Sequence, residues 1–422
     1  MKYKKFIYSY LLLISLYYIS LSGCTSKIYV DFSASPRTGT SPLYVSFTDN
    51  SQTNKEIITS WEWDFGDGVI STEKNPIHQY FTPGEYSVSL KISTNKSSSL
   101  ITKYNYINID CPAINNTTIE NFEMEIIPNI TFTQGKYWYN TLYHSVSLSS
   151  YYITAYEINN IQYCMALNMA LSNNLVTIRN NYIYSNSLNS EYGVGNDHVL
   201  INLDQSYDYL CKIYYNEYCR TFMVVDGYEN YPVVSVTWYG AVSFCNWLSQ
   251  IHDLVPCYDL TNWMLINPRN GGYRLPSESE WECAAAVSLG GDGTVYEYKY
   301  ATGTDSRPTS EMINSNGYYN MILPTGYFNG FNEGTILSKS PFGCYDMQGN
   351  VAEWCGDWFD PGYYRYCQSF GTISDPLGPD TKMIDRVVRD SSWLSGIHDT
   401  STRNHASPDT CISELGFRIV KN

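Results

Sequence analysis

Apolar residues occupy every second position in two segments near the start of the chain, Leu43–Phe47 and Tyr86–Ile92. A period of two is the pattern of β-strands that bury one face, because successive side chains point to opposite sides of a sheet. Turn-forming residues separate the apolar segments, at Ser35-Pro36, Asp64–Gly68, Asn75-Pro76 and Pro83-Gly84. Strands and turns at this spacing predict a small β-sandwich over residues 28–110.

The chain begins with the features of an export signal. Three lysines among the first five residues precede an apolar run, Phe6–Leu21, which leads into Leu21-Ser22-Gly23-Cys24. This order is typical of a cleavable signal, and the run is short and one-sided for a permanent membrane span. The last four residues resemble the lipobox of bacterial lipoproteins, in which cleavage exposes the cysteine for diacylglycerol attachment. We therefore expect removal of residues 1–23, a lipid on Cys24 and a tether over residues 24–27.

The alternative is an ordinary signal peptide with an incidental cysteine. Under the lipoprotein hypothesis the chain contacts a membrane through its lipid, because two or more acyl chains make a stable anchor. Thr25 follows Cys24, where many lipoproteins kept in the inner membrane have an aspartate. We therefore expect a protein of the cell envelope, anchored at the outer membrane or cell surface.

The net charge and the cysteines argue against two kinds of function, nucleic-acid binding and a structural zinc site. The net charge of −15 argues against a nucleic-acid partner, because binding to phosphates needs a basic face. Of the twelve cysteines, eleven follow Cys24, so at least one thiol there has no disulfide partner within the chain. None is arranged as C-x-x-C, which makes a structural zinc site a poor prediction.

Three short motifs give the first domain a family resemblance. Trp61–Gly68 (WEWDFGDG), followed by Asn75–Tyr80 (NPIHQY) and Pro83–Tyr86 (PGEY), resembles the polycystic kidney disease (PKD) domain. The resemblance implies an immunoglobulin-like spacer, adhesion or glycan-contact module over residues 28–110, without catalytic chemistry. Asp64 and Asp67 have the side chains of calcium ligands, but the turn-forming role of Asp and Gly explains them better.

The remaining sequence changes character after a linker over residues 111–122. From Glu123 to Asn422 it mixes short strands, irregular stretches rich in Tyr, Asn and Gly, and two clear helices. The first is expected over Thr237–Ile251, with one apolar face made by Trp238, Val242, Cys245 and Leu248. The second begins after Ser277, an N-cap residue with Glu280 three positions later, which is a capping box.

Five segments of this second part together resemble the formylglycine-generating enzyme, or sulfatase-modifying factor, family. In family order they are Tyr151–Asn160 (YYITAYEINN), Tyr231–Trp247, Gly272–Trp281 (GYRLPSESEW), Pro341–Trp354 (PFGCYDMQGNVAEW) and Arg386–Arg418. The resemblance covers residues 123–422. It implies an α+β, C-type-lectin-like fold with much irregular structure.

The family's oxidases use copper(I), held by two cysteine thiolates, to convert a substrate cysteine to formylglycine. At the matching places this chain has Ser395 and Thr400, and the stretch from Arg386 to Thr410 contains no cysteine. Hydroxyl oxygens are hard, neutral ligands that do not replace soft thiolates for copper(I). We therefore expect no copper and no catalytic residue. Other thiols lie outside the loop, at Cys411, Cys344, Cys355 and Cys367.

Iron and calcium are two other metals that the family resemblance brings in. Family members that use non-haem iron carry a histidine-rich helical domain, and the six histidines here show no ligand spacing. The family also binds calcium around a segment matching Gly349–Trp354, which implies oxygen ligands from Asn350, Glu353 and the Val351 carbonyl. The alternative is that Asn350 and Glu353 only hydrogen-bond the loop, and calcium would be structural in either case.

The resemblance also implies a groove that receives an extended peptide in the oxidases. Trp393, His398, Arg403 and His405 lie in or beside the matching loop, and aromatic plus basic side chains suit a binding surface. Arg403 suits a buried structural role equally well. The leading hypothesis is a non-enzymatic surface lipoprotein that binds protein or glycan, or serves envelope assembly. The rival is an active formylglycine-generating oxidase with an unrecognised metal site.

Overall fold

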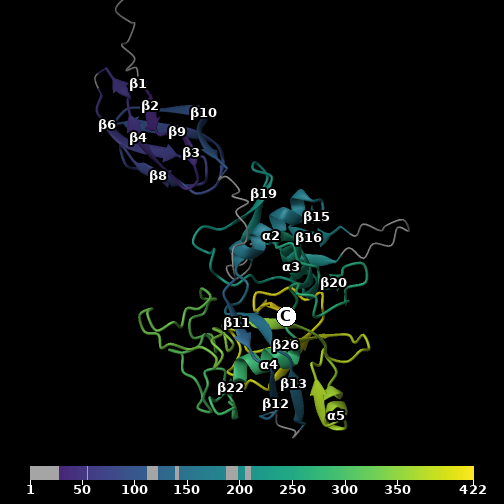
Figure 1. Cartoon of the computed structure of the whole chain (residues 1–422). Helices are drawn as coiled ribbons and strands as arrows, with labels where there is room; N and C mark the ends of the chain where they lie inside the picture. The colour runs from purple at the N-terminus through teal and green to yellow at the C-terminus, as the bar shows by residue number, and fades with distance from the viewer. Residues whose placement is uncertain (1–27, 55, 112–121, 138–141, 187–197, 205–210) are drawn as a thin grey trace, which may run out of the picture. The chain divides into compact units, whose positions relative to one another are not determined.

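The computed structural model describes residues 28–54, 56–111, 122–137, 142–186, 198–204 and 211–422 (Figure 1). These residues form two compact units, one up to Cys111 and one from Phe122 onward. Cys24, with the expected signal and tether, lies outside the described residues. Within them, every helix is too short or too polar to span a bilayer.

The first unit is a β-sandwich. Its strands are β1 (Ile28–Tyr29), β2 (Phe32–Ser35), β3 (Thr38–Thr40), β4 (Leu43–Asp49), β5 (Gln52–Thr53), β6 (Ile58–Asp64), β7 (Ile70–Ser71), β8 (Ile77–Tyr80), β9 (Gly84–Thr94) and β10 (Ser98–Asp110). One sheet has the order β2-β4-β8 and the other β3-β10-β9-β6-β7, with β1 paired to β5. A single hydrophobic cluster takes Val45 and Phe47 from the first sheet and Trp63 and Leu90 from the second. The alternation predicted for β4 and β9 is therefore confirmed.

The turn after β6 uses the two aspartates as structural groups. Asp64 Oδ1 accepts the N–H of Gly66 at 2.9 Å, and Asp67 Oδ1 accepts the N–H of Val69 at 3.1 Å. Asp67 Oδ2 lies 2.6 Å from His78 Nε2. Gly66 has φ +86°, and a Cβ there would lie 2.4 Å from the Ser87 carbonyl oxygen, so only glycine fits. The carboxylates shape the turn.

In the described residues of the second unit, short strands are interspersed with four helices. Its helices are α2 (Asn160–Ser172), α3 (Trp238–Ile251), α4 (Glu278–Ala286) and α5 (Tyr363–Gln368). Its strands are β11 (Met124–Ile127), β12 (Ile130–Gln134), β13 (His144–Leu148), β14 (Tyr151–Thr154), β15 (Val176–Arg179), β16 (Tyr182–Ser185), β17 (Val199–Asn202), β18 (Ile213–Asn216), β19 (Thr221–Val224), β20 (Tyr258–Asp259), β21 (Met264–Leu265), β22 (Val287–Leu289), β23 (Val295–Glu297), β24 (Ala352–Trp358), β25 (Thr372–Ser374), β26 (Arg386–Arg389), β27 (Arg403–Ala406), β28 (Leu415–Gly416) and β29 (Val420–Lys421).

The sheet β27-β26-β24-β28 lies between two hydrophobic clusters. Trp354 and Val388 belong to the cluster that contains α2 and α3, whereas the neighbouring Cys355 and Val387 belong to the cluster of α4, β12 and β13. Figure 1 shows α2 and α3 toward one end of this unit and α4 toward the other. Because side chains alternate along a strand, both faces of the sheet are buried. A further three-stranded sheet, β11-β14-β29, pairs an early strand with the last one.

Both helices predicted from the sequence are present, as α3 and α4. Ser277 accepts the N–H of Glu280 and the Glu280 side chain accepts the N–H of Ser277, so the predicted capping box of α4 is confirmed. Helix α3 begins at Trp238 with Thr237 as its N-cap. Its expected single apolar face is too narrow a description, because nearly every residue of α3 is buried. Helices α2 and α5 had not been predicted.

The cysteines divide into two groups. Cys111 and Cys219 each take part in a disulfide. Nine other described cysteines carry free thiols, at positions 164, 211, 245, 257, 283, 344, 355, 367 and 411.

Candidate functional site

The loop that matches the copper site of the family's oxidases joins β26 to β27. Its first half forms a turn in which the N–H of Ser392 donates to Ser395 Oγ at 2.6 Å and the N–H of Ser395 donates to the Ser392 carbonyl at 3.2 Å. Asn316 donates its N–H to the Ser395 carbonyl at 2.9 Å, and Trp393 donates its own to the Asn350 carbonyl at 2.8 Å. The Ser395 hydroxyl therefore serves the local turn.

Thr400, in the second half of the loop, bonds to a different segment. Its hydroxyl donates to the carbonyls of Tyr298 and Lys299, each at 3.2 Å, and its N–H donates to the Lys299 carbonyl at 2.9 Å. The side chain is buried. Ser395 thus serves a local turn, and Thr400 attaches the loop to Tyr298 and Lys299, which is a different role from that of a ligand pair.

The thiols elsewhere in the domain do not fit copper(I) as they lie. Burial raises the pKa of the Cys344 thiol to about 11 and raises those of Cys355 and Cys411 above the usual range, so their thiolate forms are disfavoured. Within the described ranges, His, Cys, Asp and Glu side chains nowhere gather in threes able to hold a metal ion. The residues present therefore do not fit the family's copper centre.

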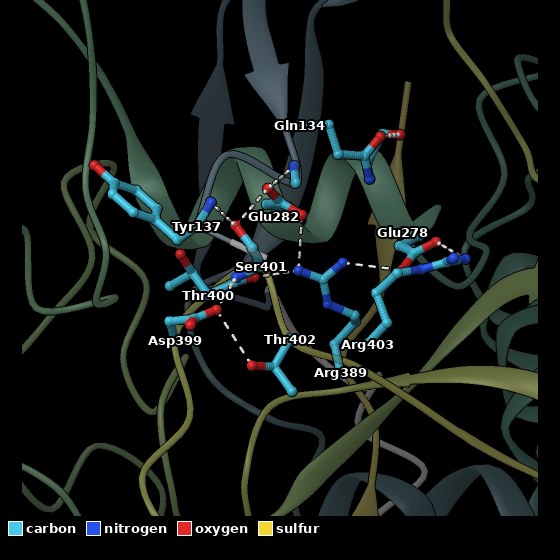
Figure 2. Close-up of polar contacts among 12 residues, drawn as sticks. Gln134, Tyr137, Glu278, Glu282, Arg389, Asp399, Thr400, Ser401, Thr402 and Arg403 are labelled. Carbon is cyan, nitrogen blue, oxygen red and sulfur yellow. Dashed lines mark hydrogen bonds and ion pairs between the residues drawn. The ribbon is translucent and has the colours of Figure 1, made fainter. Parts of the chain in front are cut away.

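Buried ion pairs hold the loop against helix α4. Arg389, the last residue of β26, donates to Glu278 at 3.0 Å and to Glu282 at 2.8 Å, with all three side chains almost fully buried. Arg389 also donates to the Thr400 carbonyl, and Glu282 accepts from the Ser401 hydroxyl at 3.3 Å (Figure 2). Charged side chains from α4 and β26 thereby fix the second half of the loop.

Arg403 takes the buried arrangement, the second of the two roles that the sequence left open for it. Its Nε and Nη2 donate to the two carboxylate oxygens of Glu278 at 2.6 and 2.8 Å, and its guanidinium carbon lies 4.1 Å from the centre of the Tyr364 ring. The side chain is buried. This bidentate, stacked arrangement is that of a structural guanidinium.

The other three residues expected in the groove occupy different environments. Trp393 is only 5% exposed. His405 is exposed, stacks on Phe359 with ring centres 4.1 Å apart, and places Nδ1 2.6 Å from Asp385. The His398 carbonyl accepts from the Gln348 side chain. Trp393, His398 and His405 therefore share the loop region without all presenting their side chains to solvent.

The residues expected to hold calcium are engaged with the protein. Asn350 Oδ1 accepts from the N–H of Leu323 at 3.0 Å, and its Nδ2 donates to Glu157 at 3.1 Å. Glu353 accepts from Arg418 Nε at 2.8 Å and from Trp281 Nε1 at 2.7 Å. Asn350 and Glu353 thus take part in the protein's own hydrogen bonds, and calcium binding by Asn350, Val351 and Glu353 stays a prediction.

Sequence reasoning did not identify two buried acids near this region. Asp390, directly after β26, has φ +72°, and burial raises its pKa well above the usual value. Its Oδ2 atom has no hydrogen-bond partner. Asp346 lies beside Glu157, and burial raises its pKa to about 6. Both positions looked like ordinary loop residues because burial depends on contacts between distant segments.

A large hollow in this unit lies elsewhere, and its lining excludes all four expected groove residues. It is a cavity of about 460 Å³ between the start of α3, the β20–β21 hairpin, the end of β24 and the start of β26. Its walls are largely aromatic and include Trp238, Tyr239, Trp263 and Trp358, with Arg386 among them. Sequence reasoning missed this cavity, since its lining residues are far apart along the chain.

Comparison with known proteins agrees with this architecture. Residues 30–109 match the PKD domain. The chlamydial serine/threonine-protein kinase pkn1 of Chlamydia pneumoniae is 31% identical over 224 residues, which are 50% of this chain and 29% of the kinase. The formylglycine-generating enzyme of Streptomyces coelicolor is 31% identical over 215 residues, which are 47% of this chain and 55% of the enzyme.

A third relative is covered more fully. The chaperone protein LppX of Paenibacillus barcinonensis is 31% identical over 230 residues, which are 46% of this chain and 71% of LppX. By contrast, the chain spans less than two thirds of the kinase and of the Streptomyces enzyme. Residues 113–422 match the sulfatase-modifying factor enzyme 1-like domain across the whole second unit. The chain therefore belongs to the sulfatase-modifying factor family, with a PKD domain preceding the family domain.

Proposed function

We propose that the family domain of this protein is a non-catalytic binding module for protein or glycan, anchored outside the cytoplasm by a lipid on Cys24. The observation that carries the proposal is the loop between β26 and β27, where Ser395 and Thr400 stand in place of the two thiols of the oxidases. The Ser395 hydroxyl serves a local turn, and the Thr400 hydroxyl bonds to the Tyr298 carbonyl of a distant segment. Without soft anionic ligands there is no support for a copper(I) site.

Two further observations support a binding role. The loop is fixed by buried charged side chains, which suits a preorganised surface better than a site that must exchange a metal and a substrate thiol. A relative that shares this domain is named as a chaperone, which is a role in assembly rather than oxidation. The PKD domain would act as a spacer between the lipid and the binding domain, at the outer membrane or cell surface.

The protein is expected to lack formylglycine-generating activity. The purified chain, incubated with copper(I), oxygen and a sulfatase-type cysteine peptide, should yield no aldehyde by mass spectrometry, because oxygen activation needs the bound metal. The Streptomyces coelicolor enzyme, treated in parallel, is the positive control. Robust turnover would overturn the proposal in favour of an oxidase with a different metal site, and loss of that turnover in Cys411→Ser or Cys344→Ser would then locate it.

Lipid attachment is the second expectation. Mass spectrometry of the mature protein should find an acylated Cys24 at its N-terminus, and Cys24→Ser should leave the precursor unprocessed and unacylated. The anchor should also make the wild-type protein partition into detergent, since acyl chains supply its membrane affinity. An unmodified N-terminus at another residue would contradict lipid anchoring while leaving the binding proposal intact.

A further inference from the structure

The 460 Å³ cavity contains a guanidinium held between two indole rings. Arg386 and Trp358 are paired across β26 and β24, and the guanidinium carbon lies 3.4 Å from the centre of the Trp358 ring and 3.6 Å from that of Trp238. Both faces of the guanidinium are therefore covered. Only the edge of the guanidinium is left for its N–H groups to donate to a ligand. The geometry of these N–H groups matches that of a carboxylate.

The charge of Arg386 is not balanced by a carboxylate. The side chain is 6% exposed, its Nη1 donates to the Gly356 carbonyl at 2.7 Å, and its Nε has no hydrogen-bond partner. Burial lowers the pKa of Arg386 to about 9, which still leaves it charged at neutral pH. A buried, incompletely paired cation is unfavourable unless an anion pairs with it.

The other charged groups that line the cavity do not supply that anion. Arg274 is neutralised by Glu280, with contacts of 2.6 and 2.7 Å. Burial, and then the negative charge of Glu278, raise the pKa of Asp357 to about 8, so this acid is largely protonated at neutral pH. Asp380 and Lys382 are exposed and opposite in sign. The lining of the cavity therefore retains one net positive charge, that of Arg386.

The wall formed by the β20–β21 hairpin is strained in a way that suits a ligand site. Trp263 is buried and has φ +60°, a conformation that bulky residues rarely adopt. Such strain costs about 1–3 kcal/mol and collects at ligand clamps, where the surrounding structure holds it. Tyr239 packs edge-on against Trp263, with ring centres 4.8 Å apart. The backbone thus keeps an indole in the cavity wall at a cost in stability.

We infer that this cavity binds an acidic sugar, a pyranose ring with one carboxylate, whose carboxylate meets the edge of the Arg386 guanidinium. Aromatic walls suit the C–H faces of a pyranose ring, which are apolar, and a site of this volume holds one or two such rings. The exposed side chain of Asn262 and the Asp357 carboxyl offer hydrogen bonds to ring hydroxyls. This inference is independent of the proposed loss of oxidase activity.

The test is a titration of the full-length protein with glucuronate, followed by tryptophan fluorescence, because three tryptophans line the cavity. We expect saturable binding with a Kd on the order of 1 mM, as is usual for a single small polar ligand. Glucose, which lacks the carboxylate, should bind about tenfold more weakly or worse. Acetate and a short peptide with a free C-terminal carboxylate should bind more weakly than glucuronate.

Variants separate the cavity from general charge effects. Arg386→Gln should weaken glucuronate binding by about tenfold or more, whereas Lys91→Gln, which removes the same charge from the PKD domain, should leave it unchanged. If Arg386→Gln does not fold, Trp358→Phe serves in its place and should weaken binding while circular dichroism stays native. Absence of saturable glucuronate binding would overturn the inference. Equal binding of glucose, stronger binding of the peptide, or unaltered binding by the folded cavity variants would do the same.

Discussion

Replacing Arg418 with methionine is expected to lower the free energy of unfolding of the family domain by about 3–5 kcal/mol. Arg418 and Glu353 are both fully buried, and Arg418 Nε and Nη2 each lie 2.8 Å from a carboxylate oxygen of Glu353. Arg418 also donates to the carbonyls of Thr154 and Tyr345, at 3.0 and 2.9 Å. Methionine fills similar space but leaves the Glu353 charge buried with Trp281 as its remaining partner.

Urea unfolding of wild type and variant measures the loss, and the chain provides a control for it. Lys136 pairs with Glu297 at 2.9 Å, but the Lys136 side chain is 47% exposed, so Lys136→Met should cost less than about 1 kcal/mol. Adding Glu353→Leu to Arg418→Met should recover much of the loss, since it removes the stranded charge. Similar effects of Arg418→Met and Lys136→Met would show that burial of the Arg418 pair contributes nothing.

Glu278→Ala is expected to have an effect of similar size, about 3–5 kcal/mol, because it leaves two buried guanidinium groups short of an anion. Glu278 accepts from Arg403 at 2.6 and 2.8 Å and from Arg389 at 3.0 Å. Burial raises the pKa of Glu278, but Arg403 and Arg389 outweigh that effect and hold it below the usual value. The carboxylate is therefore ionised in the native state. Its removal deprives both Arg403 and Arg389 of an anionic partner.

The loop should report the loss of Glu278 directly. Arg389 donates to the Thr400 carbonyl, so hydrogen exchange at the Thr400 amide should accelerate in Glu278→Ala more than the global loss of stability explains. The exposed Glu333 supplies the control, and Glu333→Ala should stay within about 0.5 kcal/mol of wild type. Unchanged exchange at Thr400, with stability lowered, would mean that the ion pairs support the core without ordering the loop.

The sequence predicted elements whose signals are local. Strands β4 and β9 carry regular alternation, and α4 carries its capping box, so these elements could be recognised without tertiary contacts. Helix α2 also has a capping box, at Asn159 and Gln162. Its apolar periodicity is blurred by Asn168, whose side chain bonds to Phe222 and Thr221 of β19. A partly buried polar residue that bonds to a neighbouring strand looks like a surface residue in sequence.

The candidate site likewise has one feature that the sequence alone shows and others that depend on tertiary contacts. The lack of cysteine between Arg386 and Thr410 is a property of composition and needed no structure. The role of Arg403 could not be predicted, because its partner Glu278 belongs to a helix in a distant part of the sequence. The cavity was missed for the same reason, since Trp238, Trp358 and Arg386 each had an unremarkable local context. Contacts between distant segments determine these assignments.

Strand β29 has a consequence for the order in which the family domain is built. Val420 pairs with Ile153 of β14, and the Val420 N–H and carbonyl both bond to Arg274, so sheets whose other strands are made early need a residue that is made much later. Loop closure over such separations is slow, and partly made chains expose apolar strands in the meantime. During synthesis, therefore, these sheets cannot be completed before Val420 has left the ribosome.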